Sequence, residues 1–415
     1  MNDLYEKMKA DASVIYLTAI EEVKPDKAVR KAIASFSFPK GRLFLIAVGK
    51  AAWQMARTAA ELMQPYKGIV ISKYDHILKP MEGIDCYEAG HPILDENGIR
   101  ASEKVLELVS DLNEDDGVLF LLSGGASALF EVPLIGLEEL QDINRQLLAS
   151  GANIIEINTI RKRLSKVKGG RFGKLCAPAK VYAVVLSDIL GDPLDMIGSG
   201  PAYPDSSTCK DALKIVEKYQ LRISEKSLAL LKEETPKILD NVETIITGSV
   251  KELTRAAMVQ AKKLGYEPVL ISEEIDGIAR EEGKKFADLA EQYLHTKQQP
   301  IALIQGGETI VKLTGKGLGG RNQEFALAAA EEIAGLPIAV FSVGSDGTDG
   351  PTDAAGAYVD GNTLSKLKEE KIDPDLVLQN NDSYHALKQI DALIITGPTG
   401  TNVNDLSVAL IHSSK

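Results

Sequence analysis

In VLFLLSGGASA (residues 118–128), a short apolar strand runs directly into a turn of glycine and serine, which is typical of a strand in an α/β sheet. The same plan recurs in LFLIAVGKAA (43–52), AVFSVGSDGTDG (339–350) and ALIITGPTGTNVND (392–405). In open parallel sheets such turns lie together at the carboxyl edge, where ligands bind. Glycine lets the backbone approach a ligand closely, and N–H groups at the start of a helix favour an anion. The sequence therefore predicts an anion site at the carboxyl edge of a sheet.

Strands and helices alternate along most of the chain, beginning with the apolar strand at 43–48. The strand VYAVVLSD (180–187) is continuously apolar, as expected of a strand that helices cover on both faces. This alternation predicts an α/β protein whose sheets are mostly parallel, Rossmann-like and flanked by helices.

A change in pattern divides the chain into two parts. The stretch 220–242 is charged and helical with a weaker apolar signal, which places a boundary near residue 238. We therefore expect an N-terminal domain of residues 1–238 and a C-terminal domain of residues 239–415. A last helix is predicted at 403–413, and it could pack back on the first domain.

The composition excludes several classes of protein. The chain has 415 residues, with 47 basic and 59 acidic side chains, so its net charge of −12 argues against a general nucleic-acid binder. No apolar run reaches the roughly 18 residues of a membrane span, and the N-terminal residues lack the pattern of a secretory signal. The three cysteines are far apart, which fits a reducing compartment. We expect a cytoplasmic protein without nucleic-acid or membrane partners, as a monomer or small homo-oligomer.

The turn SGGASA is a candidate phosphate site. Ser123 and Ser127 flank two glycines, Gly124 and Gly125, and the hydroxyl and backbone N–H groups of these residues suit phosphate oxygens. The alternative is a tight strand–helix turn that holds no ligand. The pattern G-x-x-x-x-G-K-[ST] is absent from the sequence, so the chain is not a P-loop NTPase.

Two cations are expected near helix starts, where the helix dipole disfavours positive charge. Lys50 follows the strand at 43–48, and Arg321 follows the glycine-rich stretch GKGLGG (315–320). An anionic ligand would compensate for both placements, so Lys50, Arg321 and the adjacent Asn322 are candidate substrate-binding residues. The alternative for Lys50 is a solvated side chain beside a turn.

Carboxylates provide candidate metal ligands and a candidate base. Asp188, Asp192 and Asp195 stand at and just after the end of the strand at 180–187. One carboxylate there could bind Mg²⁺ and another could accept a hydroxyl proton, although Asx turns and helix caps are the usual roles of such residues. We favour a functional role for Asp188 or Asp192 and a structural role for Asp195. Asp346 is a further candidate for Mg²⁺ or ligand hydroxyls, or a turn residue.

A basic stretch, IRKRLSKVKGGRFGK (160–174), holds seven Lys or Arg residues in this acidic chain. Apolar residues recur at helical spacing, so most of these charges are predicted to lie on a solvated helix face. An RNA-binding patch is poorly supported, because Phe172 is the single aromatic residue among them. Lys168 or Arg171 could contribute one cation to a polyanion site.

Taken together, the motifs resemble the class II glycerate kinase family, the glycerate 2-kinases. The similarity runs in order from residue 48 to residue 406, and residues 300–406 resemble the MOFRL module of that family. The pieces that carry it are VGKAA, GHPILDENG, SGGASALF, INTIRKRLSKVKGGR, LSDILGDPLDMIGSGP, QGGE, GGRNQE, SDGTDGPTDAAGA and TGTNVNDL.

The resemblance implies transfer of the γ-phosphoryl group of ATP to the 2-hydroxyl of D-glycerate, with Mg²⁺, giving 2-phospho-D-glycerate and ADP. It also implies two α/β domains with the active site in the cleft between them. By motif match, Lys50, Asp188 and Arg321 are the residues expected to be essential for catalysis.

The residues support this activity by themselves, because phosphoryl transfer mainly requires positioning and charge neutralisation. We expect the ATP phosphates on the turn at 123–127 and glycerate near Lys50 and Arg321, while the reverse placement stays open. One alternative is a nicotinamide-dependent hydroxypyruvate reductase, which the formal G-x-G-x-x-G at 315–320 supports and the lack of a ribose-binding acid opposes. Another is a non-catalytic nucleotide sensor, which the carboxylates near the phosphate turns oppose.

Overall fold

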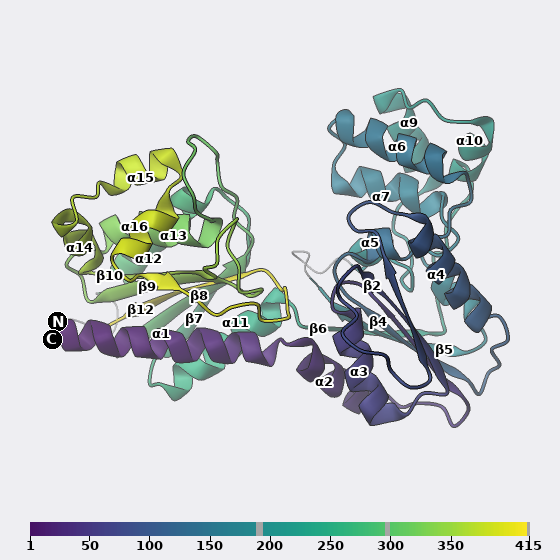
Figure 1. The fold of residues 1–415 in the computed structure, drawn as a ribbon, viewed down its shortest axis with the longest axis horizontal. Coiled ribbons are helices and arrows are strands. Elements are labelled where there is room, and N and C mark those ends of the chain that lie inside the picture. Colours follow the sequence, from purple (N-terminus) through teal and green to yellow (C-terminus); the bar gives the residue numbers. More distant parts are fainter. Residues whose placement is uncertain (188–193, 295–298, 413–415) are drawn as a thin grey trace. The chain divides into compact units, whose positions relative to one another are not determined.

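The computed structural model describes residues 1–187, 194–294 and 299–412, and its chain divides into two compact units (Figure 1). We call residues 25–187 and 194–247 the first unit. Residues 1–24 and 248–412 form the second unit. Each unit contains one six-stranded sheet with helices on both faces, so the expected α/β architecture is confirmed.

The sheet of the first unit is parallel throughout and has the strand order β3-β2-β1-β4-β5-β6. Every residue of β4 is buried, as expected for a central strand between two helical layers. β1 and β4 pair in register, so Val48 lies opposite Leu122 and the turns that follow these strands are neighbours. The strands are β1 (Leu43–Val48), β2 (Lys67–Lys73), β3 (Ile84–Ala89), β4 (Gly117–Leu122), β5 (Lys180–Leu186) and β6 (Val242–Thr247).

Some helices of the first unit cover the sheet, and others form a separate cluster. The cluster consists of α6, α7, α9 and α10, which lie together in Figure 1 around a small core that includes Leu140, Ile160 and Ala212. The helices are α2 (Pro25–Ser35), α3 (Ala52–Met63), α4 (Glu96–Leu108), α5 (Ala126–Leu129), α6 (Leu137–Ala149), α7 (Ile154–Arg163), α8 (Arg171–Leu175), the 3₁₀ helix η1 (Ile197–Ser199), α9 (Cys209–Tyr219) and α10 (Glu225–Leu231).

The sheet of the second unit is mixed and has the strand order β11-β10-β9-β12-β8-β7. β7, β8, β9 and β11 run in one direction, and β10 and β12 run against them. The strands are β7 (Glu267–Ile275), β8 (Ile301–Gly307), β9 (Ile338–Gly344), β10 (Gly356–Asp360), β11 (Leu393–Ile394) and β12 (Asp405–Ile411).

The helix expected at 403–413 is wrong, because β12 occupies this stretch in the middle of the second sheet. All seven residues of β12 are buried, and the strand pairs with β8 on one side and β9 on the other. A short apolar run is compatible with a helix or a buried strand, and its length alone does not decide. Here the unpaired backbone groups of β8 and β9 decide, since buried N–H and C=O groups need partners.

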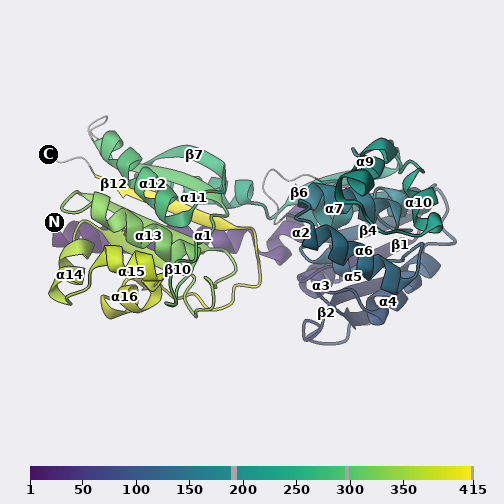
Figure 2. The same cartoon turned by 90° about the horizontal axis from the view of Figure 1, so that it is seen from above.

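The helices of the second unit cover both faces of its sheet. α1 and α11 lie on one face, and α12 and α13 lie on the other (Figures 1 and 2). α13 is central, because residues 322–330 are buried without interruption. The helices are α1 (Asn2–Glu22), α11 (Val250–Lys263), α12 (Ala279–Leu294), α13 (Arg321–Glu332), α14 (Thr363–Glu369), α15 (Pro374–Asn380) and α16 (Ser383–Gln389).

The division of the chain differs from the expected boundary at 238 in two places. Residues 1–24 belong to the second unit, where Tyr5 Oη donates to Leu336 O at 2.8 Å and Thr401 Oγ1 donates to Val23 O at 3.0 Å. Residues 242–247 belong to the first unit, because β6 pairs with β5. The helical pattern of residues 3–35 does not specify which sheet these helices cover. The sequence therefore does not predict that residues 1–24 belong to the second unit.

Candidate functional site

The first candidate site lies at the carboxyl edge of the first sheet, where the turn after β1 meets the turn after β4. Lys50 N donates to Gly124 O at 2.9 Å, and Ala51 N donates to the hydroxyl of Ser123 at 3.1 Å. The hydroxyl of Ser123 is therefore used to join the two turns. Gly125 has φ of +90°, and a Cβ there would come within 3.0 Å of the His91 ring, so this position requires glycine.

Lys50 projects from this edge as an exposed cation. No hydrogen bond or ion pair joins its ammonium to another residue in the described part of the chain. Gly124 and Gly125 are partly exposed beside it. A phosphate or carboxylate at this edge would thus meet one flexible ammonium and the backbone of two glycines.

His91 belongs to the same edge, although it was not among the residues predicted for the site. Its ring lies against Gly125 and near Lys50. Burial lowers the pKa of His91, and the positive charge of Lys50 lowers it further, so the imidazole is neutral at pH 7. The motif GHPILDENG contains this residue, but a single histidine after a strand gives no chemical signal by itself.

Ser127 is held by the basic stretch at 160–174. Arg161 Nη2 and Lys168 Nζ donate to Ser127 O at 3.0 and 2.9 Å, and the Ser127 hydroxyl is 3.1 Å from that of Ser199. Burial lowers the pKa of Lys168 to about 8. These contacts fix the shape of the turn that carries Gly124 and Gly125.

The expected solvated face at 160–174 is wrong for its central residues, because Lys162, Arg163 and Lys168 are fully buried. Lys162 Nζ contacts Asp205 Oδ1 at 3.0 Å and Asp195 Oδ2 at 3.2 Å. Buried charges are tolerated when they are paired and hydrogen-bonded, as here. Asp195, for which a structural role as a turn or cap residue was expected, instead pairs with the buried Lys162.

Two predicted carboxylates, Asp188 and Asp192, lie outside the described residues. Asp346, the third candidate for Mg²⁺, accepts a hydrogen bond from Thr348 N at 2.9 Å, as a turn residue does. In the part of the chain that the structure describes, no three or more His, Cys, Asp or Glu side chains form a group suited to a metal ion. Magnesium often uses one or two carboxylates together with substrate phosphates, so such a group is not required.

The second candidate site surrounds Arg321, the first residue of α13. Its guanidinium binds Asp405 through two contacts, Nε to Oδ2 at 2.6 Å and Nη2 to Oδ1 at 3.0 Å. Nη1 contacts Glu308 Oε1 at 2.8 Å. The anion expected beside Arg321 is therefore supplied, in this structure, by two carboxylates of the same chain.

The two carboxylates differ in burial. The side chain of Asp405 is 7% exposed, whereas that of Glu308 is 47% exposed. Burial raises the pKa of Asp405 to about 6, although the hydrogen bond and charge of Arg321 oppose this rise. Asp405 is thus the buried partner of the guanidinium, and Glu308 is the partner that solvent reaches.

Asn322, a predicted substrate-binding residue, is buried behind Arg321. Its Oδ1 accepts from Ser342 Oγ at 2.6 Å, and its backbone N–H donates to Asp349 Oδ1 at 3.1 Å. Asp349 also accepts from Gln323 N at 2.9 Å and so caps the start of α13. These contacts make Asn322 a support for the helix start that carries Arg321.

A cavity of about 620 Å³ opens beside Arg321. It is lined by the irregular segment 308–320 between β8 and α13, by Gly350 and Pro351, and by Asp276. The glycines of GKGLGG do not form a dinucleotide turn, since the segment before them is not a strand. Gly317 N instead donates to Asn380 O at 2.8 Å, so these glycines allow close packing on the turn between α15 and α16.

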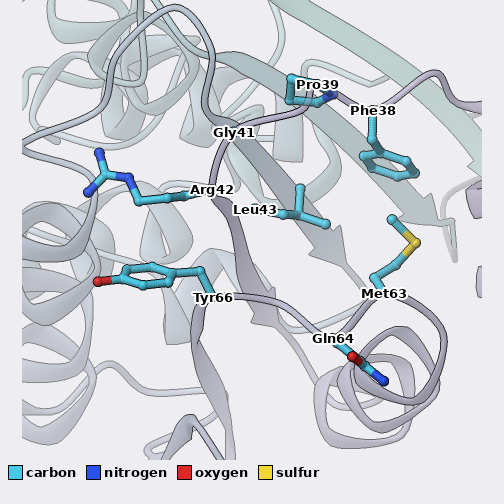
Figure 3. A pocket seen from close by; sticks show the side chains of 8 residues that line it. All are labelled: Phe38, Pro39, Gly41, Arg42, Leu43, Met63, Gln64 and Tyr66. Atoms are coloured by element: carbon cyan, nitrogen blue, oxygen red, sulfur yellow. The ribbon is translucent and has the colours of Figure 1, made fainter.

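A further cavity, of about 590 Å³, lies at the amino end of β1 in the first unit (Figure 3). Figure 3 shows Phe38, Leu43 and Met63 turned toward one another, while the Arg42 side chain points away beside Tyr66. Arg42 is paired with Asp116 at 2.6 Å. Because Leu43 begins β1 and Lys50 follows its end, this cavity is at the opposite edge of the sheet from Lys50.

Comparison with known proteins identifies relatives along nearly the whole chain. Residues 11–232 match the family described as a domain of unknown function (DUF4147), and residues 301–405 match the MOFRL family. A protein of Thermotoga maritima named D-glycerate 2-kinase is 51% identical over 414 residues, which cover 98% of this chain and 99% of that protein. An Agrobacterium vitis protein named putative hydroxypyruvate reductase is 38% identical over 390 residues, covering 90% and 88% of the two chains.

A solved structure has the same fold. The crystal structure of a glycerate kinase from Thermotoga maritima superimposes with a TM-score of 0.93 and 50% sequence identity. The match covers 98% of this chain and 100% of that chain. Within the described residues, none of the helices has the length and apolar character needed to cross a membrane.

Proposed function

The chain belongs to the glycerate 2-kinase family, and from this premise we propose that it transfers the γ-phosphoryl group of ATP to the 2-hydroxyl of D-glycerate. The resemblance drawn from the motifs is thereby confirmed, as is the expectation of a kinase. One observation carries the proposal for this chain. Each unit presents a cation, Lys50 or Arg321, at a turn or helix start that follows a strand of its sheet.

The proposed reaction forms one bond and breaks one. The 2-hydroxyl oxygen of D-glycerate attacks the γ-phosphorus, and the bond from that phosphorus to the β–γ bridging oxygen breaks. The products are 2-phospho-D-glycerate and ADP, and the hydroxyl proton passes to a base. Lys50 and Arg321 would offset the negative charge of the transferred group, which is the main requirement of such a reaction.

Asp188 and Asp192 are the proposed carboxylates for the base and for Mg²⁺. Magnesium would neutralise charge on the β- and γ-phosphates when bound. Both residues follow β5 in the sequence and lie outside the described residues. The protein is proposed to act in the cytoplasm as a monomer or small homo-oligomer.

The test is to incubate the protein with Mg-ATP and D-glycerate and to identify the product isomer by phosphorus NMR. We expect equal amounts of ADP and 2-phospho-D-glycerate. Formation of the 3-phospho isomer would refute the assignment of the 2-hydroxyl. ATP binding without any ADP formation would refute the kinase and support a non-catalytic nucleotide sensor.

A hydroxypyruvate reductase is the second candidate, because a relative at 38% identity bears that name. The packing of GKGLGG against Asn380 opposes it, since a dinucleotide-binding turn joins a strand directly to a helix. Mixing the protein with NADH or NADPH and hydroxypyruvate decides the matter. A fall in nicotinamide absorbance that depends on the protein would support the reductase and contradict the kinase proposal.

A further inference from the structure

The cavity beside Arg321 is too large for glycerate alone. Its volume of about 620 Å³ lies within the usual range of 300–1,000 Å³ for pockets that bind cofactors and drug-sized ligands. A three-carbon acid would fill a small part of it. The remaining space has room for a larger ligand, and the apolar side chains of the walls suit a ligand with an apolar part.

Apolar side chains stand exposed at this cavity. Ile310 is 58% exposed and Leu313 is 80% exposed, and both line the cavity together with Pro351. Covering an exposed aliphatic side chain with an apolar group lowers the free energy of the complex. Glycerate carries an oxygen on each carbon and offers no such group, whereas a purine base offers two apolar faces.

The wall that carries these side chains is fixed before any ligand binds. Thr314 N and Gly315 N both donate to Asn381 Oδ1, at 2.7 and 2.8 Å. Leu318 N donates to Asp382 Oδ1 at 2.9 Å. The segment is therefore attached at several points to the turn between α15 and α16, and little ordering is needed when a ligand enters.

Of the charged residues that line the cavity, Asp276 and Arg321 suit a nucleotide, while Glu308 and Glu324 are paired with Arg321 and Arg280. Asp276 is exposed at its wall and forms no hydrogen bond or ion pair with another residue that the structure describes. A carboxylate accepts hydrogen bonds from ribose hydroxyls, as in known nucleotide sites. Arg321 lines the same cavity and supplies the cation that phosphates require.

We propose that this cavity takes the nucleoside part of the phosphoryl donor, with the base against Ile310 and Leu313 and the phosphates directed to Arg321. The inference rests on the proposed kinase function and adds the location of the donor. It reverses the placement expected from the sequence, because glycerate then belongs at the edge with Lys50, Gly124 and Gly125. The second unit binds the donor, and the first unit binds the acceptor.

The test uses the full chain with Ile310→Ser and Leu313→Ser, each made singly. Both side chains are largely exposed, so their replacement leaves the fold intact, which circular dichroism verifies. Leu376→Ser is the matched control, since Leu376 is 62% exposed in the same unit and does not line the cavity. Calorimetry measures the Kd of ADP and of inorganic tripolyphosphate, and steady-state kinetics gives KM for Mg-ATP and for D-glycerate.

We expect the Kd of ADP and the KM of Mg-ATP to rise roughly tenfold in each cavity variant, because each loses contact with the base. Tripolyphosphate affinity and the KM of D-glycerate should stay unchanged, as should every constant of the control. A rise confined to the KM of D-glycerate would overturn the proposal and assign the cavity to the acceptor. Unchanged constants in both cavity variants would overturn it as well.

Failure of the proposed kinase function can be distinguished from failure of the proposed nucleoside site. A wild-type protein that forms no ADP with D-glycerate would contradict the proposed function, whatever the variants do. The Kd of ADP is measured without turnover, so the nucleoside site is tested even then. If ADP binds tightly to such a protein and more weakly to the cavity variants, the proposed nucleoside site is supported and the proposed kinase reaction is refuted.

Discussion

Lys50 and Arg321 both lie near the start of a helix, yet their surroundings differ sharply. Lys50 is an exposed ammonium without an ion-pair partner among the described residues, whereas Arg321 is held by Asp405 and Glu308. A lysine is a point charge on a flexible stem, and an arginine is a planar group whose orientation two hydrogen bonds can fix. The first unit therefore offers the mobile ammonium of Lys50, and the second unit offers the guanidinium of Arg321 in a fixed orientation.

The comparison predicts the largest effect for Arg321→Ala, which should lower kcat by at least about 100-fold because one charge-stabilising donor is lost. The same change leaves the buried Asp405 without its cation, and losing one partner of a buried pair costs about 3 kcal/mol of unfolding free energy. Urea unfolding and steady-state kinetics measure the two effects separately. Near-normal turnover with an intact fold would remove Arg321 from the site.

For Lys50→Ala we expect a similar loss of turnover without the loss of stability. The fall in kcat should be about 100-fold or more, while the free energy of unfolding changes by less than about 0.5 kcal/mol, as for other exposed side chains. Thermal unfolding of both variants provides the comparison. If Lys50→Ala destabilises the protein as much as Arg321→Ala does, the proposed difference between the two sites is refuted.

The pKa of Asp405 predicts a pH dependence that arises at the Arg321 site. As the pH falls through about 6, Asp405 becomes protonated, so the guanidinium loses its charged support and kcat/KM should decrease. Because the folded-state pKa is raised, protonation favours the folded state, and this stabilisation is lost as the pH rises from about 4 to about 6. The pH profile of kcat/KM measures the first effect.

Asp405→Asn is the control for this pH dependence. The variant keeps the shape of the side chain and cannot titrate, so the decrease near pH 6 should be absent from its profile. Unfolding free energies of the two proteins at pH 4 and pH 6 measure the second effect. A profile that is the same in the wild type and the variant would exclude Asp405 as its source.

The smallest effect is expected for Glu308→Gln. This exposed carboxylate contacts Arg321 Nη1, and an exposed ion pair contributes only about 0.2–1 kcal/mol. Its removal frees the guanidinium for an anionic ligand, so tripolyphosphate should bind up to about fivefold more tightly at low salt. Calorimetry at low and high ionic strength measures this change. Weaker binding in the variant would instead show that Glu308 takes part in holding the ligand.

The sequence pattern predicted the first sheet well because its signals are local. The strand expected at 43–48 is β1, and the turn SGGASA follows the central strand β4 as expected. Apolar runs between glycine-rich turns specify a parallel sheet without reference to distant residues. Lys50 and Arg321 were also predicted near helix starts, and the two helices begin at Ala52 and Arg321.

The errors concern features that depend on partners far away in the chain. β12 is a strand because it pairs with β8 on one side and β9 on the other. The apolar run of β12 by itself does not predict these partners. Lys162 is buried because Asp205 lies beside it, and Arg321 is paired with a residue 84 positions later. No periodicity within a short window encodes such contacts, so charged residues at 160–174 look solvated in the sequence.

The position of β12 also determines the order in which the two units can fold during synthesis. All strands of the first unit precede residue 248, so a ribosome delivers that unit complete while the remainder is still being made. In the second unit, β12 lies between β8 and β9 and is synthesised after every other strand of that sheet. Until β12 emerges, the edges of β8 and β9 that face it have no strand partner. Open edges invite pairing with other chains, so nascent or truncated forms lacking 405–411 should be the species that chaperones retain.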